Sequence, residues 1–289
     1  MIATARWLVE LWLRRYWKPG PAAAKFEGQT PYVVITGASE GIGRALATRF
    51  AEDGHALLLV ARSAAPLEVA AGELRGRFKS KVEICPVDLA TAAGCARVEA
   101  QLVELGGFAD ILVNNAGIGL SGQFYGQSRE DIARLCDLNM RSLTDLMRRF
   151  LPGMCVRGRG GILNVASFGG LIPGPHQAVY YASKAYVISL TEAVRFEARG
   201  EGVRIAVLLP GPVATKFHAK MGADASYYRL LGAHSAETIA RSGYAGFMWG
   251  RTLIVPGFLL PFGWLGAKVI PHVLLLPLIG WLLKRRESD

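Results

Sequence analysis

The sequence predicts one α/β domain built on a doubly wound parallel β-sheet, with a hydrophobic extension at each end of the chain. Three observations support this fold class. Short apolar runs alternate with helix-length segments, a glycine-rich turn follows the first of these runs, and the two most apolar segments lie at the ends. The chain has 289 residues, of which 51% are hydrophobic and 19% are charged. That length accommodates one large domain with a substantial core.

The extension at the amino end, residues 1–24, contains a predicted amphipathic helix. Arg6, Glu10 and Arg14 recur at every fourth residue, so they form one stripe on the helix and leave a broad apolar face. Charges at this spacing also interrupt the apolar run that a signal peptide needs. Residues 19–21, Pro-Gly-Pro, end the helix. The pattern fits a helix lying in a membrane interface, or one packed on the protein's own surface or on a second subunit.

The central segment, residues 25–257, carries the predicted sheet. Its apolar runs are continuous and rich in β-branched residues, which is typical of parallel strands buried on both faces. The helix-length segments between them complete the β–α alternation of a Rossmann-like single domain. The predicted strands are 32–36, 56–61, 82–87, 110–115, 161–167, 204–210 and a last short strand within 252–257, and the predicted helices are 42–53, 65–78, 91–105, 129–152 and 179–199.

The pattern changes after the sixth predicted strand. Residues 212–245 are polar and rich in glycine and alanine, which is consistent with a flexible helical lid. Residues 258–289 form an apolar tail whose charges are Lys268 and those from residue 284 onward. Three prolines divide this tail into pieces shorter than the roughly 20 residues that span a bilayer, so we expect a kinked, monotopic membrane insertion. A flap over a substrate pocket or a dimer interface is the alternative.

The formal net charge of +10 raises the question of a nucleic-acid partner. Nucleic-acid-binding proteins cluster their lysines and arginines along one element. Here the densest basic groups, within residues 14–18 and 284–286, flank the two apolar extensions, which fits anionic lipid headgroups better. We therefore expect no nucleic acid. The four cysteines have no metal-binding spacing, so they are expected to be small buried hydrophobes of a reducing compartment, and no metal site is predicted.

The first predicted strand runs into the sequence TGASEGIGRA at residues 36–45. Gly37, Gly41 and Gly43 permit a tight turn with close backbone approach, and the helix that begins there points its N–H groups at a phosphate. A glycine-rich turn alone is a weak indication. A strand before it and a helix after it are the context that a dinucleotide-binding fold requires.

The sequence VYYASKAYV at residues 179–187 places Tyr180 four residues, and Tyr181 three residues, before Lys184. Both spacings bring a tyrosine and the lysine onto a shared helix face, so geometry leaves either tyrosine as the partner. A phenol with a pKa near 10 is a poor base at neutral pH, and a nearby ammonium lowers that pKa by favouring the phenolate. The segment is thus either an acid–base pair or the apolar face of a buried helix.

Taken together, these motifs resemble the short-chain dehydrogenase/reductase family. The resemblance covers roughly residues 30–257, and the two apolar ends lie outside it. It is carried, in the family's order, by T-G-x-x-x-G-x-G at 36–43, N-N-A-G at 114–117, Asn139 in a helix, Ser167 after a strand, Y-x-x-x-K at 180–184 and P-G…T at 210–215.

The resemblance implies four catalytic residues: Asn139, Ser167, Tyr180 and Lys184. It selects Tyr180 as the residue that exchanges a proton with a substrate oxygen. Ser167 would hydrogen-bond the same oxygen, Lys184 would also hold the nicotinamide ribose, and Asn139 would hold a water that relays protons to solvent. Tyr181 is expected to pack against the lid or a neighbouring subunit.

The resemblance also implies a set of cofactor-binding residues, drawn from the motifs and from the ends of the second and third strands. NAD-selective folds place an acid after the second strand for the ribose 2′-OH, whereas an arginine accommodates the 2′-phosphate of NADP. Here Arg62 follows Ala61 with no acid, so NADP(H) is favoured over NAD(H), while Arg44 is either a further contact or a solvated helix residue. The implied residues are Thr36, Gly37, Ser39, Gly41, Ile42, Gly43, Arg62, Asp88, Leu89, Asn115, Ala116, Gly117, Tyr180, Lys184, Pro210, Gly211, Val213 and Thr215.

The function implied by the resemblance is interconversion of a carbonyl and a secondary alcohol. Apolar side chains within the lid and the apolar tail suggest a hydrophobic, lipid-like substrate of the ketoacyl or steroid type. The lid side chains are Phe217, Met221, Tyr227, Tyr228, Leu230 and Leu231. The chain looks like the membrane-associated branch of hydroxysteroid and ketoacyl reductases. The expected location is the cytoplasmic side of a membrane, as a peripheral or monotopic homodimer or homotetramer. The alternative is a catalytically silent NADP-binding regulatory or scaffold protein. It is disfavoured because Ser167, Tyr180 and Lys184 are all present.

Overall fold

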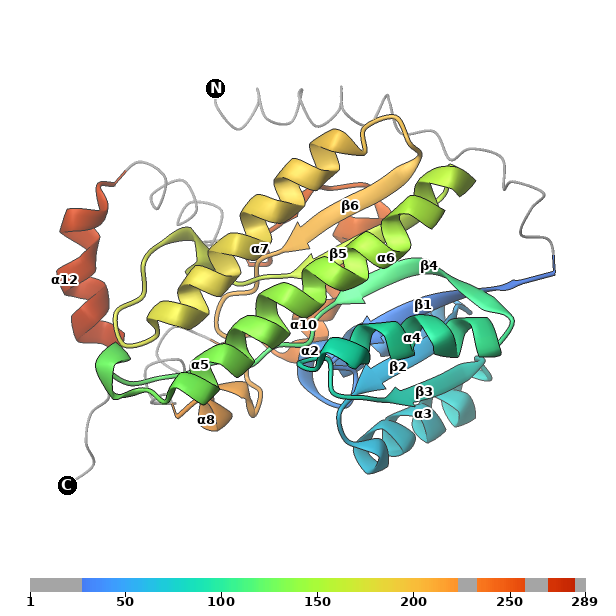
Figure 1. The fold of residues 1–289 in the computed structure, drawn as a ribbon, viewed down its shortest axis with the longest axis horizontal. Coiled ribbons are helices and arrows are strands. Elements are labelled where there is room, and N and C mark those ends of the chain that lie inside the picture. Colours follow the sequence, from blue (N-terminus) through green and yellow to red (C-terminus); the bar gives the residue numbers. More distant parts are fainter. Residues whose placement is uncertain (1–27, 223–232, 258–269, 284–289) are drawn as a thin grey trace.

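The computed structural model describes residues 28–222, 233–257 and 270–283, and these contain a single seven-stranded sheet (Figure 1). All strand pairs are parallel and the order is β3-β2-β1-β4-β5-β6-β7. This confirms the predicted doubly wound, Rossmann-like fold. The strands are β1 (Thr30–Thr36), β2 (Ala56–Ala61), β3 (Val82–Pro86), β4 (Gly107–Asn114), β5 (Gly160–Val165), β6 (Val203–Leu208) and β7 (Leu253–Ile254).

The strands end earlier than the apolar pattern indicates. Prediction extended the fourth, fifth and sixth strands to 115, 167 and 210, whereas β4, β5 and β6 end at Asn114, Val165 and Leu208. Residues just beyond these ends, among them Asn115, Ser167 and Pro210, line a cavity. Because the strand order reverses between β1 and β4, this is also the topological switch point at which open α/β sheets bind ligands.

Two layers of helices cover the sheet (Figure 1). The residues that each layer buries form two separate apolar clusters, one on each face. One layer contains α2 (Gly41–Glu52), α3 (Ala64–Phe78) and α10 (Ala236–Met248), and the other contains α4 (Ala92–Glu104), α5 (Arg129–Cys136), α6 (Ser142–Arg157) and α7 (Ala178–Glu197).

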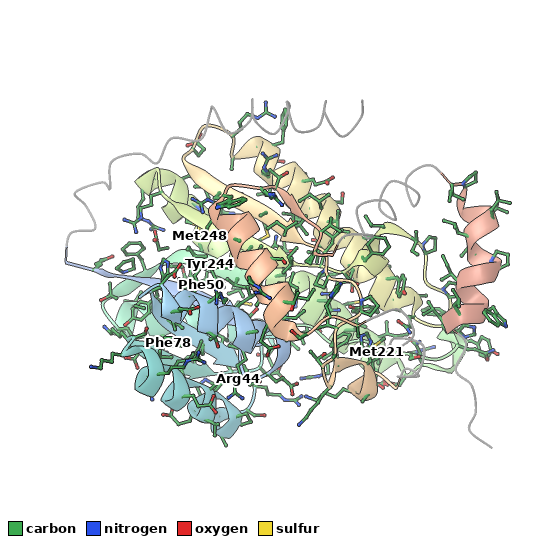
Figure 2. All side chains as sticks on the ribbon, turned by 180° about the vertical axis from the view of Figure 1, so that it is seen from behind. Arg44, Phe50, Phe78, Met221, Tyr244 and Met248 are labelled. Atoms are coloured by element: carbon green, nitrogen blue, oxygen red, sulfur yellow. The ribbon has the colours of Figure 1, made fainter. Side chains whose placement is uncertain are left out.

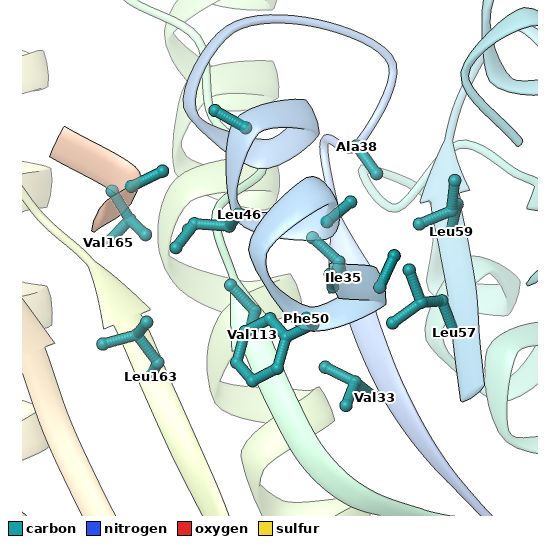
Figure 3. Close-up of a cluster of buried hydrophobic side chains, with 14 of the residues drawn as sticks. Val33, Ile35, Ala38, Leu46, Phe50, Leu57, Leu59, Val113, Leu163 and Val165 are labelled. Carbon is teal, nitrogen blue, oxygen red and sulfur yellow. The ribbon is translucent and has the colours of Figure 1, made fainter. Parts of the chain in front are cut away.

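The cluster beneath α2 shows why these segments form strands and a helix (Figure 3). Successive side chains of a strand point to opposite faces, so residues two apart share a face. Val33 and Ile35 of β1 and Leu57 and Leu59 of β2 therefore all pack on the side of the sheet that α2 covers. Phe50 of α2 inserts between them and is fully buried.

The segment predicted as one helix over 129–152 is interrupted. A π-helical turn, η3 (Asp137–Arg141), joins α5 to α6, and Asn139 lies within it. The π turn is an inserted-residue irregularity that is common at functional sites. Residue patterns of period 3.6 do not reveal it, because the same apolar face continues on both sides.

The predicted lid, residues 212–245, divides into parts with different surroundings. Residues 236–248 form α10, whose inner face is buried against the sheet and α2. Tyr244 packs edge-on against Phe50 with ring centres 4.9 Å apart (Figure 2). Residues 223–232 lie outside the described residues. Among the described residues of this segment, 212–218 line the cavity and include the start of the single-turn helix α8 (Phe217–Lys220). Ser235, Ala236, Glu237 and Arg241, at and near the start of α10, line it as well.

The apolar ends are described only in part. The amino-terminal segment 1–24 lies outside the described residues, as do 258–269 and 284–289 of the tail. Residues of the tail between these gaps form α12 (His272–Leu283), which passes Pro175 at Gly280. Within the described segments, no helix is long and apolar enough to cross a bilayer.

The four cysteines are free thiols. Cys85 and Cys95 are buried as expected, whereas Cys136 and Cys155 are only half-buried. Burial raises the pKa of the Cys95 thiol to about 12, so this cysteine is a neutral core residue at physiological pH.

The role of Phe50 in joining α2 to the sheet gives a stability prediction. Phe50→Ala should lower the free energy of unfolding by about 3–5 kcal/mol, because it leaves a cavity between β1, β2 and α2. Phe196→Ala, the same change at a side chain that is 65% exposed on α7, should cost under about 1 kcal/mol. Urea titration of both variants checks this, and equal losses would contradict it.

Candidate active site

A cleft of about 1430 Å³ opens at the carboxyl ends of β1, β4, β5 and β6. It gathers residues that are far apart in the chain but follow neighbouring strands. Most of the predicted site residues line it: Gly37, Ser39, Gly41, Ile42, Asn115, Ala116, Gly117, Ser167, Tyr180, Lys184, Pro210, Gly211, Val213 and Thr215.

The glycine-rich turn forms one wall of the cleft. Gly37 and Gly41 adopt φ of +65° and +57°, in the left-handed region that disfavours other residues. A Cβ at Gly43 would lie 2.3 Å from the carbonyl oxygen of Gly37. Each of these glycines is therefore required by the backbone path, and α2 begins directly against the turn.

Thr36 and Asn115 fix this turn to the neighbouring strand. The Thr36 hydroxyl accepts hydrogen bonds from the amides of Asn115 and Ala116, at 2.9 and 3.0 Å. The Asn115 side-chain amide donates to the carbonyls of Thr36 and Gly37, at 2.9 and 3.2 Å. Thr36 is fully enclosed, so its predicted cofactor role is support beneath the cleft rather than contact.

The turn and helix suit a pyrophosphate group. Glu40 precedes α2 without capping it through its side chain, so the amide N–H groups of the first turn are not satisfied by a capping side chain. A helix N-terminus carries partial positive charge and binds anions. Glycines that admit no Cβ leave the backbone open to close approach. These observations fit a dinucleotide in the cleft.

Ser167 lies two residues beyond β5, at the start of the short helix η4 (Phe168–Leu171). Its hydroxyl oxygen accepts a hydrogen bond from the Gly169 amide at 3.1 Å. This bond orients the oxygen, and the hydroxyl proton can then be donated to a group in the cleft.

Lys184 comes from α7 and is only 6% exposed. Its ammonium donates to the carbonyl of Val165 at 3.0 Å and lies 5.8 Å from the ring centre of Tyr180. Burial lowers the pKa of Lys184 to about 8, since desolvation disfavours the charged form.

Asn139 lies behind the cleft and is 2% exposed. Its side-chain oxygen accepts from the amide of Ile118, and its nitrogen donates to the carbonyl of the same residue, both at 2.9 Å. The nitrogen also donates to the hydroxyl of Ser183 at 3.1 Å. Both N–H groups of the amide are thus engaged, and its oxygen accepts one hydrogen bond from the protein.

Ser183 is a supporting residue that sequence reasoning missed. Its hydroxyl donates to the carbonyl of Tyr180 at 2.7 Å while it accepts from Asn139, so it joins the π turn to α7. The sequence could have indicated this role through the position of Ser183 directly before Lys184, since both residues lie on the buried face of α7.

The two adjacent tyrosines have different surroundings. Tyr180 lines the cleft. Tyr181 also reaches the cleft, but its ring packs on the segment after β5: a Cβ at Gly174 would lie 2.3 Å from it, and one at Gly169 would lie 3.0 Å away. The expected partner of Tyr181 was the lid or a second subunit. Within the chain, Tyr181 packs against this glycine-containing loop, and its expected contact with a second subunit stays a prediction.

Five predicted cofactor residues lie outside the cleft lining: Thr36 and Gly43 support the glycine-rich turn, and Arg62, Asp88 and Leu89 follow β2 and β3. Arg62 is exposed and Leu89 is buried. Asp88 accepts from the amide of Ala90 at 3.0 Å and pairs with Arg134 at 2.7 Å. Partial burial alone would raise the pKa of Asp88, but these bonds, foremost the one from Arg134, hold it below its usual value.

Helix α8 covers the other side of the cleft. Phe217 lies 5.5 Å from Tyr180 between ring centres. Met221 packs so closely on Gly119 that a Cβ there would lie 2.9 Å from its methyl group. Lys220 forms an ion pair with Glu40 at the start of α2. Residues from the turn, the β4 loop and α7 thus all hold α8 in place.

The fold and cleft define a dinucleotide-binding α/β protein. Residues 31–226 match the family described as short chain dehydrogenase. The chain therefore belongs to the short-chain dehydrogenase/reductase family, a family of oxidoreductases, as its motifs indicated.

Two relatives illustrate the similarity. The very-long-chain 3-oxoacyl-CoA reductase of Homo sapiens is 31% identical over 208 residues, which are 70% of this chain and 65% of that protein. The sulfoacetaldehyde reductase of Chromohalobacter salexigens is 37% identical over 220 residues, which are 73% of this chain and 85% of that protein. The match thus spans less than two thirds of the human reductase.

Two solved structures share the fold over most of both chains. A short-chain dehydrogenase from Sphingobium yanoikuyae in complex with NADPH is 32% identical with a TM-score of 0.76, covering 90% of this chain and 98% of that one. A short chain dehydrogenase/reductase from Burkholderia phymatum in complex with NAD is 25% identical with a TM-score of 0.75, covering 91% and 98%. The two differ in bound cofactor, so the likeness leaves the choice of cofactor open.

The burial of Lys184 gives a prediction on stability and pH. Between about pH 8 and 10.5, Lys184 is mostly protonated in the unfolded chain but mostly neutral in the native protein. The destabilisation caused by burying the charged lysine at lower pH is therefore lost as the pH rises through this window. The free energy of unfolding of the wild type, relative to Lys184→Met, should rise by roughly 3 kcal/mol over this window. Denaturant unfolding across the pH range measures it, and a difference that does not vary with pH would contradict it.

Proposed function

We propose that the protein is an NADP(H)-dependent oxidoreductase that interconverts a carbonyl and a secondary alcohol on a hydrophobic, lipid-like substrate. The observation that carries the proposal is the convergence of Ser167, Tyr180 and Lys184 on one cleft whose opposite wall is the glycine-rich turn. A silent NADP-binding regulator would need the turn but not this convergence.

The side chains have complementary tasks in carbonyl reduction. When bound, the nicotinamide cofactor supplies the hydride. Tyr180 donates a proton to the carbonyl oxygen as negative charge develops there. Ser167, oriented by the Gly169 amide, hydrogen-bonds the same oxygen and stabilises that charge. The reverse roles apply to alcohol oxidation.

Lys184 supports the proton transfer electrostatically. Its ammonium favours the phenolate of Tyr180 after the proton has left. Because burial holds the pKa of Lys184 near 8, anionic groups placed beside it would favour its charged form. The phosphates of a bound dinucleotide would be such anionic groups, and Lys184 would hold the neutral nicotinamide ribose by hydrogen bonding.

The preference for NADP(H) rests on residues at the end of β2. Ala61 and Arg62 stand where an NAD-selective fold places an acid, and Arg62 is exposed. The Sphingobium yanoikuyae protein in complex with NADPH supports this preference, while the NAD complex from Burkholderia phymatum does not.

The substrate class rests on the side chains around Tyr180. Ile172, Tyr181 and Phe217 give the cleft an apolar wall near the catalytic tyrosine. The name of the human relative, a very-long-chain 3-oxoacyl-CoA reductase, points the same way. A small anionic substrate, as in the name of the sulfoacetaldehyde reductase, is the competing possibility.

Membrane association is part of the proposal and rests on α12. Described residues of this segment expose Val273, Leu274 and Trp281, at 73%, 68% and 66%, and residues 270–283 contain no Asp, Glu, Lys or Arg. Three basic residues follow at 284–286. An apolar helix bordered by cations suits attachment to the cytoplasmic face of an anionic membrane as a peripheral or monotopic protein.

The assignment of Tyr180 is tested by a matched pair of substitutions. Tyr180→Phe should lower turnover at least about 100-fold, because it removes the transferable proton, while leaving NADPH binding unchanged. Tyr181→Phe should retain most activity, because its ring still fills the space beside Gly174. Absorbance of NADPH is followed with ketones and 3-oxoacyl thioesters of increasing chain length.

The opposite ranking of the two variants would overturn the assignment of Tyr180. Tight NADPH binding by the wild type without turnover of any compound in the series would favour the silent regulator. Highest activity on short, charged carbonyls would contradict the lipid-like substrate.

The membrane proposal is tested at α12 with the full chain. Leu274→Asp and Trp281→Asp should each weaken binding to vesicles containing anionic phosphatidylserine by about tenfold, since an aspartate costs energy in an apolar interface. Val103→Asp, at an equally exposed position of α4, should change little. Sedimentation with vesicles measures binding. Equal effects at α4 and α12 would contradict the proposal.

A further inference from the structure

A second arginine lies beside the proposed NADP(H) site, and it is already bound to a carboxylate. Arg44, in the first turn of α2, lines the cleft and forms an ion pair with Glu73 of α3. Figure 2 labels Arg44 on the face of the molecule formed by α2, α3 and α10. The pair joins α2 to α3, the helix that follows β2. In dinucleotide-binding folds of this kind the ribose 2′ position is recognised by residues that follow the second strand.

Arg44 and Arg62 differ in their partners. Arg62 is exposed, and among the described residues its charge acts on Asp88, after β3, without a hydrogen bond or ion pair between the two side chains. The side chain of Arg44 is 38% exposed and faces Glu73, which is 59% exposed. A 2′-phosphate entering this region therefore meets one available guanidinium and one that a carboxylate already holds.

Glu73 and a 2′-phosphate are alternative partners for the same group. An arginine binds carboxylate and phosphate through the same planar array of N–H donors. The carboxylate also repels a phosphate dianion nearby. A ribose 2′-OH carries no charge, so it neither competes with Glu73 nor is repelled by it.

We propose that Glu73 is a cofactor-selectivity residue, which holds Arg44 and thereby weakens recognition of a 2′-phosphate relative to a 2′-OH. The inference rests on the proposed dinucleotide site and refines its choice of cofactor. Arg44 is then the group through which Glu73 acts, and the wild-type preference for NADP(H) is smaller than Arg62 and Arg44 alone would give.

The chain offers a matched control on the same helix. Glu68 of α3 is 55% exposed and pairs with Arg75 at 2.6 Å, but Arg75 does not line the cleft. Glu68→Gln thus removes the same charge from the same helix and breaks the same kind of pair. It leaves Arg44 and Glu73 in place.

The experiment measures equilibrium binding of two fragments to the full chain by calorimetry. Adenosine 2′,5′-bisphosphate and 5′-AMP differ only in the 2′-phosphate. Glu73→Gln should tighten binding of the bisphosphate about 2- to 5-fold, the range expected for an exposed ion pair, and leave 5′-AMP binding within about twofold. Glu68→Gln should change the ratio of the two affinities by less than Glu73→Gln does.

A double substitution separates the proposed route from a general charge effect. In an Arg44→Gln background, Glu73→Gln should no longer change the affinity ratio more than Glu68→Gln does. The inference is overturned if Glu73→Gln tightens both fragments equally, leaves the ratio unchanged, or acts equally well without Arg44.

These outcomes are distinct from failure of the proposed cofactor preference. That preference fails when the wild type binds the bisphosphate no more tightly than 5′-AMP. The role of Glu73 depends only on the change in the ratio on substitution, so a preference that first appears in Glu73→Gln would support it.

Discussion

The contact between the carboxyl ends of β1 and β4 is the constraint on which the rest of the site depends. Thr36 and Asn115 close this contact with four hydrogen bonds that join the two strand ends directly. They lie where the sheet order reverses, so the loops on either side diverge and leave the cleft between them. Without this connection the glycine-rich turn would have no fixed position relative to the residues that follow β4.

A second network of hydrogen bonds extends this constraint to the side chains proposed to be catalytic. Asn139 joins the loop after β4 to α7 by bonding Ile118 and Ser183. Lys184 in turn bonds the end of β5 through the Val165 carbonyl. A buried polar group is costly unless it is bonded, so these bonds select one arrangement of the π turn, the helix and the strand end.

The described fold follows from the sequence because its signals are repeated along the chain. Apolar runs such as 56–61 indicated buried parallel strands, and β2 has those bounds. The π turn at Asn139 was not predictable in this way, since one inserted residue leaves the apolar face of the surrounding helix unchanged. The core position of α10 was also missed, because its many glycines and alanines permit close packing but look like a loop composition.

In the candidate site, too, some parts could be predicted from the sequence and others could not. Its cofactor wall is built from backbone, and the backbone path requires glycine at positions such as 37 and 43, so the residue pattern is diagnostic. The pairing of Arg44 with Glu73 was not predictable, because neither position constrains the backbone and their separation of 29 residues has no periodic signal. Selectivity contacts between exposed side chains must be found in three dimensions.

The distinction between Tyr180 and Tyr181 shows how the two kinds of information combine. Consecutive helical residues point about 100° apart, so only one of the two rings can take a given position in the cleft. Helical spacing cannot say which one, because both tyrosines lie within reach of Lys184. The deciding feature is Gly174, where any Cβ would collide with the Tyr181 ring. The Tyr181 ring thus packs against the loop at a glycine outside every recognised motif, while Tyr180 lies beside Phe217, which is consistent with the proposed role of Tyr180 as proton donor.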